Sequence, residues 1–153
     1  EIEEISPTEV GAHYEHLNLE NVVGGVYLPK DGQGDPANIA LAMAKVIEET
    51  RGRDIRILDL RKVTEVFDYF ALATGSSRRQ MHAVSDEIER VIKDDWGDLK
   101  RGIEGYDESH WIVLDYGDVV VHLFDAQARD YWDLEQLWSD AEPVELPATT
   151  KNE

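Results

Sequence analysis

The segment from residue 104 to residue 138 constrains the fold most, because it places two apolar strands, a tight turn and an aromatic helix in one short stretch. Its sequence is EGYDESHWIVLDYGDVVVHLFDAQARDYWDLEQLW. Two β-rich runs joined by a short turn are typical of a β-hairpin, and the run that follows them has helical spacing. The segment contains no recognisable catalytic grouping. It therefore predicts a surface that binds a partner rather than a pocket that transforms a substrate.

The length and composition fit one soluble domain. The chain has 153 residues, of which 42% are hydrophobic, and this is enough to bury a core. No apolar run reaches the roughly 18 residues that a membrane-spanning helix needs, and the first residues lack the basic-then-apolar order of a secretion signal. We therefore expect no membrane contact and a cytoplasmic location, or an organelle stroma or matrix in a eukaryote. The chain has no cysteine, which excludes disulfides and thiolate metal sites.

The charge of the chain is strongly acidic, with 15 Lys and Arg residues against 33 Asp and Glu residues. The ends, residues 1–35 and 140–153, carry more than half of this excess, but the middle is also negative. Such a surface repels the phosphate backbone of nucleic acids, so we expect no direct nucleic-acid binding. A basic protein partner would be attracted. The alternative is that the acidity only keeps the chain soluble, and composition alone favours that reading.

The prolines mark the boundaries of the folded domain. All five lie outside residues 37–142, so regular structure can run through that segment without interruption. We expect an acidic leader at residues 1–35, a folded domain at residues 36–141 and a C-terminal tail at residues 142–153. The leader has one short strand-like patch at residues 22–28, and it is interpreted as a tail, a docking arm or an edge strand.

Capping signals and apolar spacing predict two helices in the first half of the domain. Asp35 followed by Pro36 is typical of a helix start. Ser77 with Gln80 three residues later forms a capping box at the start of the second helix. The buried faces are predicted to be Ile39, Met43, Val46 and Ile47 in the first helix, and Met81, Val84, Ile88, Val91 and Ile92 in the second.

The remaining elements predict a mixed β-sheet. Residues 54–60 and 67–74 are short runs rich in β-branched or aromatic residues and are bounded by polar turns. A further short segment at residues 99–104 precedes the hairpin. The order helix, strand, strand, helix, strand, hairpin, helix predicts an α/β fold in which helices sandwich a mixed sheet.

The predicted hairpin presents two different faces. We expect Tyr116 and Gly117 to form its two-residue turn, so that Asp115 lies opposite Asp118. Two opposed aspartates are unfavourable unless a cation lies beside them, from Arg129 or from a partner, or unless one of them bonds the turn backbone. The turn bond is the favoured explanation. One face is aliphatic, and the other carries Trp111, Val113, Val120, His122 and Phe124.

The last helix predicts an exposed tryptophan. On a helical wheel, Trp132 lies roughly opposite the sector that would face the core. An exposed tryptophan beside a partly apolar sheet face is typical of interface anchors, whose truncation commonly costs about 2 kcal/mol or more. The alternative is that residues 126–132 are not helical and Trp132 points inward. The sector assigned to the core contains Tyr131, Leu134, Leu137, Trp138 and Ala141.

Catalytic and metal sites find little support. The pair Gly75 and Ser76, between a strand and a helix, resembles the entry loop of nucleotidyltransferases, where backbone amides hold phosphate and paired aspartates bind magnesium. No Asp-x-Asp pair follows on the downstream strand, so a capped helix is the favoured interpretation. His13 and His16 have helical spacing but no defined third ligand. We expect no catalytic residue, no metal and no cofactor.

Two segments, FDYFALATGSSRRQMHAV and the longer stretch from EGYDESHW to LWSDA, resemble the Iojap-type ribosomal silencing factors. The resemblance covers about residues 38–141. It rests on four motifs: a strand ending in Thr-Gly-x-Ser-x-Arg, Glu-Gly before a Trp-led strand, Asp-x-Gly-Asp-x-x-x-His, and Arg-x-Tyr-Trp-x-Leu-Glu-x-Leu-Trp.

The resemblance implies a non-enzymatic fold related to nucleotidyltransferases that has lost the metal aspartates. It further implies a protein that binds the ribosomal large subunit through large-subunit protein fourteen, blocks joining of the small subunit and represses translation under nutrient limitation. Family contact positions match Trp111, Val113, Trp132 and Leu134. Asp115 and Asp118 are expected to steer a basic partner, and His122 and Arg129 are assigned to the same surface.

Two other functions stay open. A nucleotide-binding enzyme of the nucleotidyltransferase kind would require magnesium-dependent nucleotide binding. A self-associating scaffold would pair its aromatic surface with that of a second copy, and the sequence leaves a homodimer of the free protein open.

Overall fold

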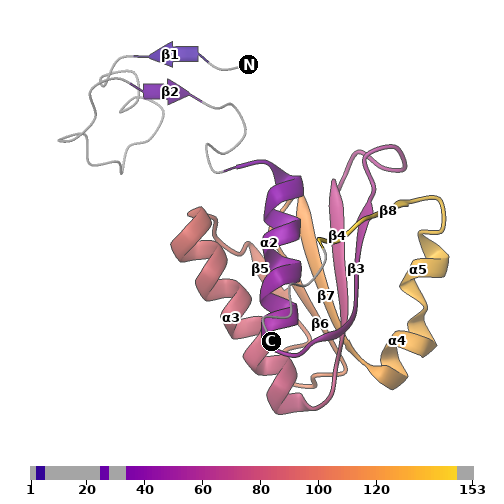
Figure 1. Ribbon diagram of the computed structural model, residues 1–153. Helices are drawn as coiled ribbons and strands as arrows, with labels where there is room; N and C mark the ends of the chain where they lie inside the picture. The colour runs from indigo at the N-terminus through magenta and orange to yellow at the C-terminus, as the bar shows by residue number, and fades with distance from the viewer. Residues whose placement is uncertain (1–2, 6–24, 28–33, 148–153) are drawn as a thin grey trace. The chain divides into compact units, whose positions relative to one another are not determined.

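The computed structural model describes residues 3–5, 25–27 and 34–147 (Figure 1). The chain divides into two compact units, Glu1–Gly34 and Asp35–Glu153. In the first unit, strands β1 (Glu3–Ile5) and β2 (Gly25–Tyr27) pair antiparallel. The strand predicted at residues 22–28 therefore corresponds in part to β2, whereas His13 and His16 lie outside the described residues.

A six-stranded mixed sheet forms the centre of the second unit, with the strand order β5-β6-β7-β4-β3-β8. Strands β4 and β7 run parallel, and the other neighbouring strands pair antiparallel. This arrangement confirms the predicted α/β fold with a mixed sheet. The strands are β3 (Arg53–Asp59), β4 (Tyr69–Gly75), β5 (Gly102–Glu104), β6 (Trp111–Asp115), β7 (Val119–Asp125) and β8 (Glu142–Val144).

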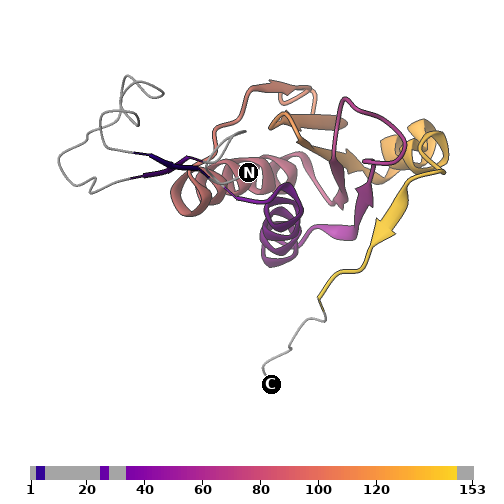
Figure 2. The same ribbon diagram turned by 90° about the horizontal axis from the view of Figure 1, so that it is seen from above.

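Helices cover both faces of the sheet, as Figure 2 shows. Helices α2 (Pro36–Glu49) and α3 (Arg78–Trp96) pack on one face, and α4 (Ala126–Trp132) and α5 (Leu134–Leu137) lie on the other. The core accordingly has two parts. The larger part contains the predicted apolar stripes of α2 and α3, and the smaller part contains Leu58, Leu60, Phe70, Leu72, Val120, Phe124, Ala128, Leu134 and Ala141.

The predicted helix starts are confirmed. The Asp35 carboxylate accepts a hydrogen bond from the Ala37 N–H at 2.9 Å, and proline opens α2. The Ser77 hydroxyl accepts one from the Gln80 N–H at 3.0 Å at the start of α3. Helix α3 ends at Gly97, whose φ of 66° is the left-handed conformation that favours glycine.

The hairpin of β6 and β7 has a different register from the predicted one. Its turn residues are Gly117 and Asp118, and Asp115 pairs with Val120 instead of Asp118. A φ of 87° at the first turn position requires glycine there. The register moved by two residues, which leaves every side chain on its predicted face because strand side chains alternate with a period of two. Asp115 Oδ1 accepts the Gly117 N–H at 2.7 Å, so the turn bond is confirmed.

The predicted last helix is broken into two. Asp133 has φ 43° and ψ 55°, a left-handed conformation that ends α4, and α5 starts one residue later. The helical wheel assumed one continuous helix and is therefore wrong for two of its residues. Tyr131 and Leu137 are 77% and 74% exposed instead of buried, while Leu134 and Ala141 do lie in the core.

Strand β8 lies in the segment that the sequence assigned to the C-terminal tail. It pairs with β3 at the edge of the sheet, where a proline, Pro143, is tolerated because one side of an edge strand needs no hydrogen bond. The folded unit thus extends past residue 141.

Candidate functional site

An uncovered group of apolar side chains lies where β6 and α4 meet. Trp132 is 55% exposed and Tyr131 is 77% exposed, while Trp111 and Val113 are half-buried. We call these four residues the aromatic patch. The ring centroids of Trp111 and Trp132 lie 5.5 Å apart, and those of Tyr131 and Trp132 lie 5.1 Å apart at an interplanar angle of 87°.

The chain connectivity explains how the patch forms. Asp125 ends β7 and also caps α4, because its Oδ1 accepts the Ala128 N–H at 2.7 Å. Antiparallel pairing places Trp111, at the start of β6, opposite Phe124, at the end of β7. Helix α4 begins directly after this point and packs on β7 and β4, so its last residue, Trp132, reaches Trp111 while β6 stays partly uncovered.

Trp111 is held on the sheet by two contacts. Its indole stacks on the Phe124 ring, with centroids 5.0 Å apart and planes 26° apart. Its Nε1–H donates to His122 Nδ1 at 3.1 Å. His122 is only 6% exposed, and burial lowers the pKa of its imidazole to about 4, so the ring is neutral at neutral pH.

The structure separates the predicted contact residues into two groups. It brings Trp111, Val113 and Trp132 together at the surface. It places His122 beneath them and buries Leu134, which is 8% exposed, in the smaller part of the core. His122 bonds the Trp111 indole directly, and Leu134 belongs to the core cluster against which Trp111 and Val113 pack.

The predicted polar residues lie at two different ends of the sheet. Asp115 and Asp118 are at the turn, about 13 Å from Trp111 along β6, since a strand rises about 3.3 Å per residue. Arg129, the alternative source of a cation at this turn, does not lie there. Its Nε donates to Glu135 Oε1 at 2.7 Å and its Nη1 to Thr74 Oγ1 at 3.1 Å, at the opposite end of the sheet.

Two acidic residues beside the patch were not predicted from the sequence. Asp130 and Asp133 are exposed and flank Tyr131 and Trp132 in the chain. A cavity of about 240 Å³ next to α4 is lined by Asp54, Thr74, Ala126, Arg129, Asp130, Asp133 and Glu135. The short spacing of acidic and aromatic residues in RDYWDLE is the sequence signal that could have indicated a negatively charged rim.

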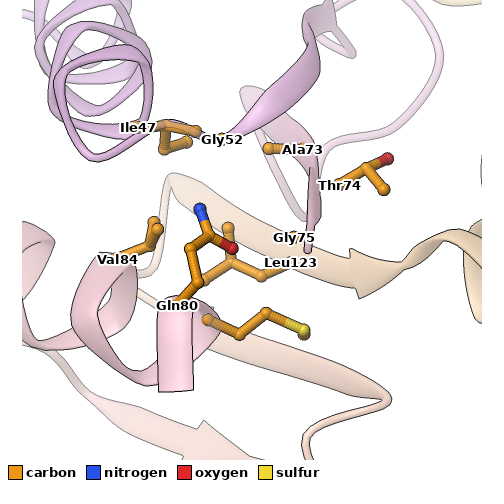
Figure 3. Close-up of a pocket in the computed structure, with 9 residues that line it drawn as sticks. Ile47, Gly52, Ala73, Thr74, Gly75, Gln80, Val84 and Leu123 are labelled. Atoms are coloured by element: carbon orange, nitrogen blue, oxygen red, sulfur yellow. The ribbon is translucent and has the colours of Figure 1, made fainter. Parts of the chain in front are cut away.

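The loop that resembles a nucleotide entry loop is filled by the chain itself. Figure 3 shows the Gln80 side chain in the pocket between β4, α2 and α3, and this pocket leaves no volume that a water molecule could occupy. Gln80 Oε1 accepts the Ser76 N–H at 3.0 Å, and its Nε2 donates to the Thr50 carbonyl at 3.0 Å. A Cβ at Gly75 would lie 2.2 Å from Met81 Cγ. The amide that would hold a phosphate already has a partner.

A serine and a histidine lie close together but do not form a nucleophile and its base. His82 Nε2 is 2.7 Å from Ser109 Oγ and 2.6 Å from the Tyr106 carbonyl oxygen. A carbonyl can only accept, so Nε2 carries the proton and cannot take one from Ser109. The Ser109 hydroxyl also donates to the Tyr106 carbonyl at 2.7 Å. These bonds tie the loop before β6 to α3.

Potential metal ligands do not cluster in the part of the chain that the structure describes. Within residues 3–5, 25–27 and 34–147, no three His, Asp or Glu side chains lie where they could share a metal ion. No helix among the same residues has the length and apolar character needed to cross a membrane.

Comparison with known proteins gives consistent matches. The family model described as "Ribosomal silencing factor during starvation" matches residues 34–153. Ribosomal silencing factor RsfS of Bacillus subtilis is 38% identical over 103 residues, which cover 67% of this chain and 86% of that protein. The mouse protein named "Mitochondrial assembly of ribosomal large subunit protein 1" is 28% identical over 134 residues, which cover 84% of this chain and 58% of that protein.

A solved structure agrees with the fold. The crystal structure of a Chromobacterium violaceum protein superposes with a TM-score of 0.67 at 33% sequence identity, and the match covers 77% of this chain and 98% of that one.

Proposed function

The chain belongs to the family of ribosomal silencing factors, and from this we propose that it binds the large ribosomal subunit through its aromatic patch and blocks joining of the small subunit. The observation that carries the proposal is the exposed indole of Trp132 beside the half-buried indole of Trp111, with ring centroids 5.5 Å apart. In this proposal the binding partner on the subunit is a basic protein, and the family resemblance implies large-subunit protein fourteen.

The residue types of the patch and its acidic neighbours support a protein partner. Tryptophan and tyrosine dominate the binding energy of protein interfaces when they are buried at the centre and ringed by polar groups. Here two tryptophans and a tyrosine lie side by side, and Asp130 and Asp133 flank them. Val113 extends the apolar area along β6, and His122 holds the Trp111 indole by a hydrogen bond.

The charge of the chain supports a basic partner. A formal net charge of −18 attracts a cationic protein surface and repels the phosphates of ribosomal RNA. The chain is thus guided to a protein on the subunit surface rather than to RNA. The name of the mouse relative refers to assembly of the ribosomal large subunit, which is compatible with a large-subunit partner.

The proposed mechanism is steric. Once the patch is buried against the large subunit, the sheet and helices α2 and α3 occupy the space in front of the partner protein. The small subunit meets the large subunit at that face, so the two cannot join. The acidic surface also repels the RNA of the approaching small subunit.

Co-sedimentation with purified large subunits tests the proposal. The wild-type chain is expected to pellet with large subunits and not with small ones, and chemical cross-linking is expected to join the patch side of the chain to protein fourteen. Absence from the large-subunit pellet would refute the proposed function. Binding with cross-links to other ribosomal proteins would refute the partner but not the function.

A further inference from the structure

The tie between Trp111 and His122 is unusual for a side chain at a protein surface. An indole near solvent usually gives its N–H to water, but here the Nε1–H of Trp111 points into the molecule and donates to His122 Nδ1 at 3.1 Å. The part of Trp111 that stays at the surface is therefore apolar carbon. Docking of a partner on this surface strips no hydrogen-bonded water from the indole nitrogen.

This hydrogen bond fixes the tautomer of His122. The indole N–H can only donate, so Nδ1 must accept and the imidazole proton lies on Nε2. Nε2 is buried and has no hydrogen-bond partner among the residues that the structure describes. One imidazole nitrogen, Nδ1, thus has a hydrogen bond, and the other, Nε2, has none within the described part of the chain.

A buried group with an unsatisfied donor is destabilising, and an aliphatic side chain would avoid it. The surroundings of His122 are suited to such a side chain, because its ring lies edge-on to Phe70 with centroids 4.6 Å apart and nearly parallel to Phe124 at 6.2 Å. Nothing in this packing requires an imidazole. The feature that an aliphatic residue could not supply is the acceptor for Trp111.

The orientation of Trp111 in turn affects the rest of the patch. Its ring stacks on Phe124 with centroids 5.0 Å apart and contacts Trp132 at 5.5 Å. Without the acceptor, only the ring contacts would hold the indole, and its N–H would gain a hydrogen bond by turning toward water. The contact with Trp132 would then be lost for part of the time.

From these contacts we propose that His122 is a positioning residue for the docking surface: it fixes the Trp111 indole with its N–H inward and its apolar face outward. The inference rests on the proposed function, since it concerns the same surface. His122 does not touch the partner itself, because it is 6% exposed.

Two substitutions separate the acceptor from simple packing. His122→Leu keeps an apolar side chain of similar size but has no acceptor. His122→Asn is smaller, but its Oδ1 is three bonds from Cα, as Nδ1 is in histidine, so it can accept the Trp111 N–H. The full chain is used, and each variant is checked for folding by circular dichroism and thermal unfolding.

The first measurement is the indole ¹H–¹⁵N signal of Trp111 in the free protein. It is expected to move to the position of a solvated indole in His122→Leu and to stay near the wild-type position in His122→Asn. An unchanged signal in His122→Leu would overturn the proposal. This result does not depend on ribosome binding.

The second measurement is the dissociation constant for purified large subunits. His122→Leu is expected to bind about three- to tenfold more weakly, the cost of immobilising one large side chain on binding, and His122→Asn is expected to recover most of the loss. Equal weakening in both folded variants, or wild-type affinity in His122→Leu, would overturn the positioning role. If the wild type itself does not bind, the proposed function fails, and the indole signal alone decides the role of His122.

Discussion

The indole rings of Trp111 and Trp132 contact each other at a centroid distance of 5.5 Å, although Trp111 opens strand β6 and Trp132 ends helix α4, with strand β7 between them in the chain. Trp111 is tied to the sheet by Phe124 and His122, whereas Trp132 is 55% exposed. The pair therefore combines a fixed ring with an open one. A partner can bury Trp132 without moving the sheet, and this property makes the pair suitable as an anchor.

Truncation of the open ring should affect binding more than folding. Trp132→Ala is expected to weaken binding to large subunits by about 30-fold, which corresponds to a loss of about 2 kcal/mol typical of an interface anchor. The free energy of unfolding should fall by less than about 1 kcal/mol, because more than half of the side chain is already exposed. Quantitative co-sedimentation and urea unfolding measure the two effects.

Leu99→Ala is the matched control for this prediction. Leu99 is a 63% exposed apolar residue close in sequence to Gly102, which pairs with Asp115 at the other end of the hairpin. Its truncation should leave binding unchanged. Equal losses in Trp132→Ala and Leu99→Ala would show that the docking surface is not the aromatic patch.

The acidic residues beside the patch should accelerate association. Asp130→Asn and Asp133→Asn are each expected to lower the association rate with large subunits and to change the dissociation rate little, because rim charges act mainly on the encounter. Raising the ionic strength from about 0.01 M to about 0.15 M shortens the Debye length from about 30 Å to about 8 Å. The association rate of the wild-type protein should therefore also fall. Stopped-flow fluorescence measures these rates.

Asp95→Asn removes the same charge from α3, on the opposite face of the sheet. Its association rate should stay close to that of the wild type. Rates that depend on neither salt nor Asp130 would remove the steering role of these carboxylates.

Gln80 should contribute to stability and not to binding. Gln80→Ala removes the bonds to the Ser76 N–H and the Thr50 carbonyl, both at 3.0 Å, and should lower the free energy of unfolding by about 1 to 2 kcal/mol. Gln127→Ala, an exposed glutamine of α4, is the control and should change stability by less than about 0.5 kcal/mol. Affinity for large subunits should be unchanged in the folded Gln80→Ala protein, and a large decrease would assign this loop to the binding surface.

The buried imidazole of His122 should make stability depend on pH. Burial lowers its pKa to about 4 in the folded protein, whereas in the unfolded chain it returns to about 6.5. Between these values the unfolded state binds more protons, so stability is fully present above about pH 6.5 and falls as the pH drops toward about 4. The difference between the folded and unfolded pKa values corresponds to about 3 kcal/mol of stability.

Urea unfolding at about pH 7 and about pH 4.5 tests this contribution. The decrease in stability between the two conditions should be clearly smaller in His122→Leu than in the wild type. Asp125 and Asp59 also have lowered pKa values, but their contribution to folding stability is lost only at more acidic pH. Both carboxylates are also present in the wild type and in His122→Leu. Equal decreases would show that His122 is not buried in its neutral form.

The hairpin shows why sequence reasoning succeeded for the faces and failed for the register. The alternation of Trp111, Val113 and Asp115 fixes which side chains share a face, and a shift of two residues does not change it. The turn itself was misplaced, because the requirement for a positive φ at Gly117 is compatible with more than one turn frame. The predicted surface therefore correctly contains Trp111, but Trp111 pairs with a different residue of the neighbouring strand, Phe124.

The last helix shows what a helical wheel cannot detect. The break depends on the left-handed conformation of one residue, Asp133. Aspartate tolerates this conformation, but an aspartate in the sequence does not predict it. It turns Tyr131 and Leu137 outward and adds Tyr131 to the patch.

The strand β8 was missed because a proline such as Pro143 normally indicates the end of a helix or strand. Proline is compatible with a strand mainly when that strand lies at the edge of a sheet.

The most direct test of the central claim is the joining of purified large and small subunits, followed by light scattering in the presence of increasing amounts of the protein. The wild-type chain is predicted to prevent joining in proportion to its occupancy of the large subunit, and Trp132→Ala should need about 30 times more protein for the same effect. Normal joining of subunits to which the wild-type chain remains bound would contradict the account.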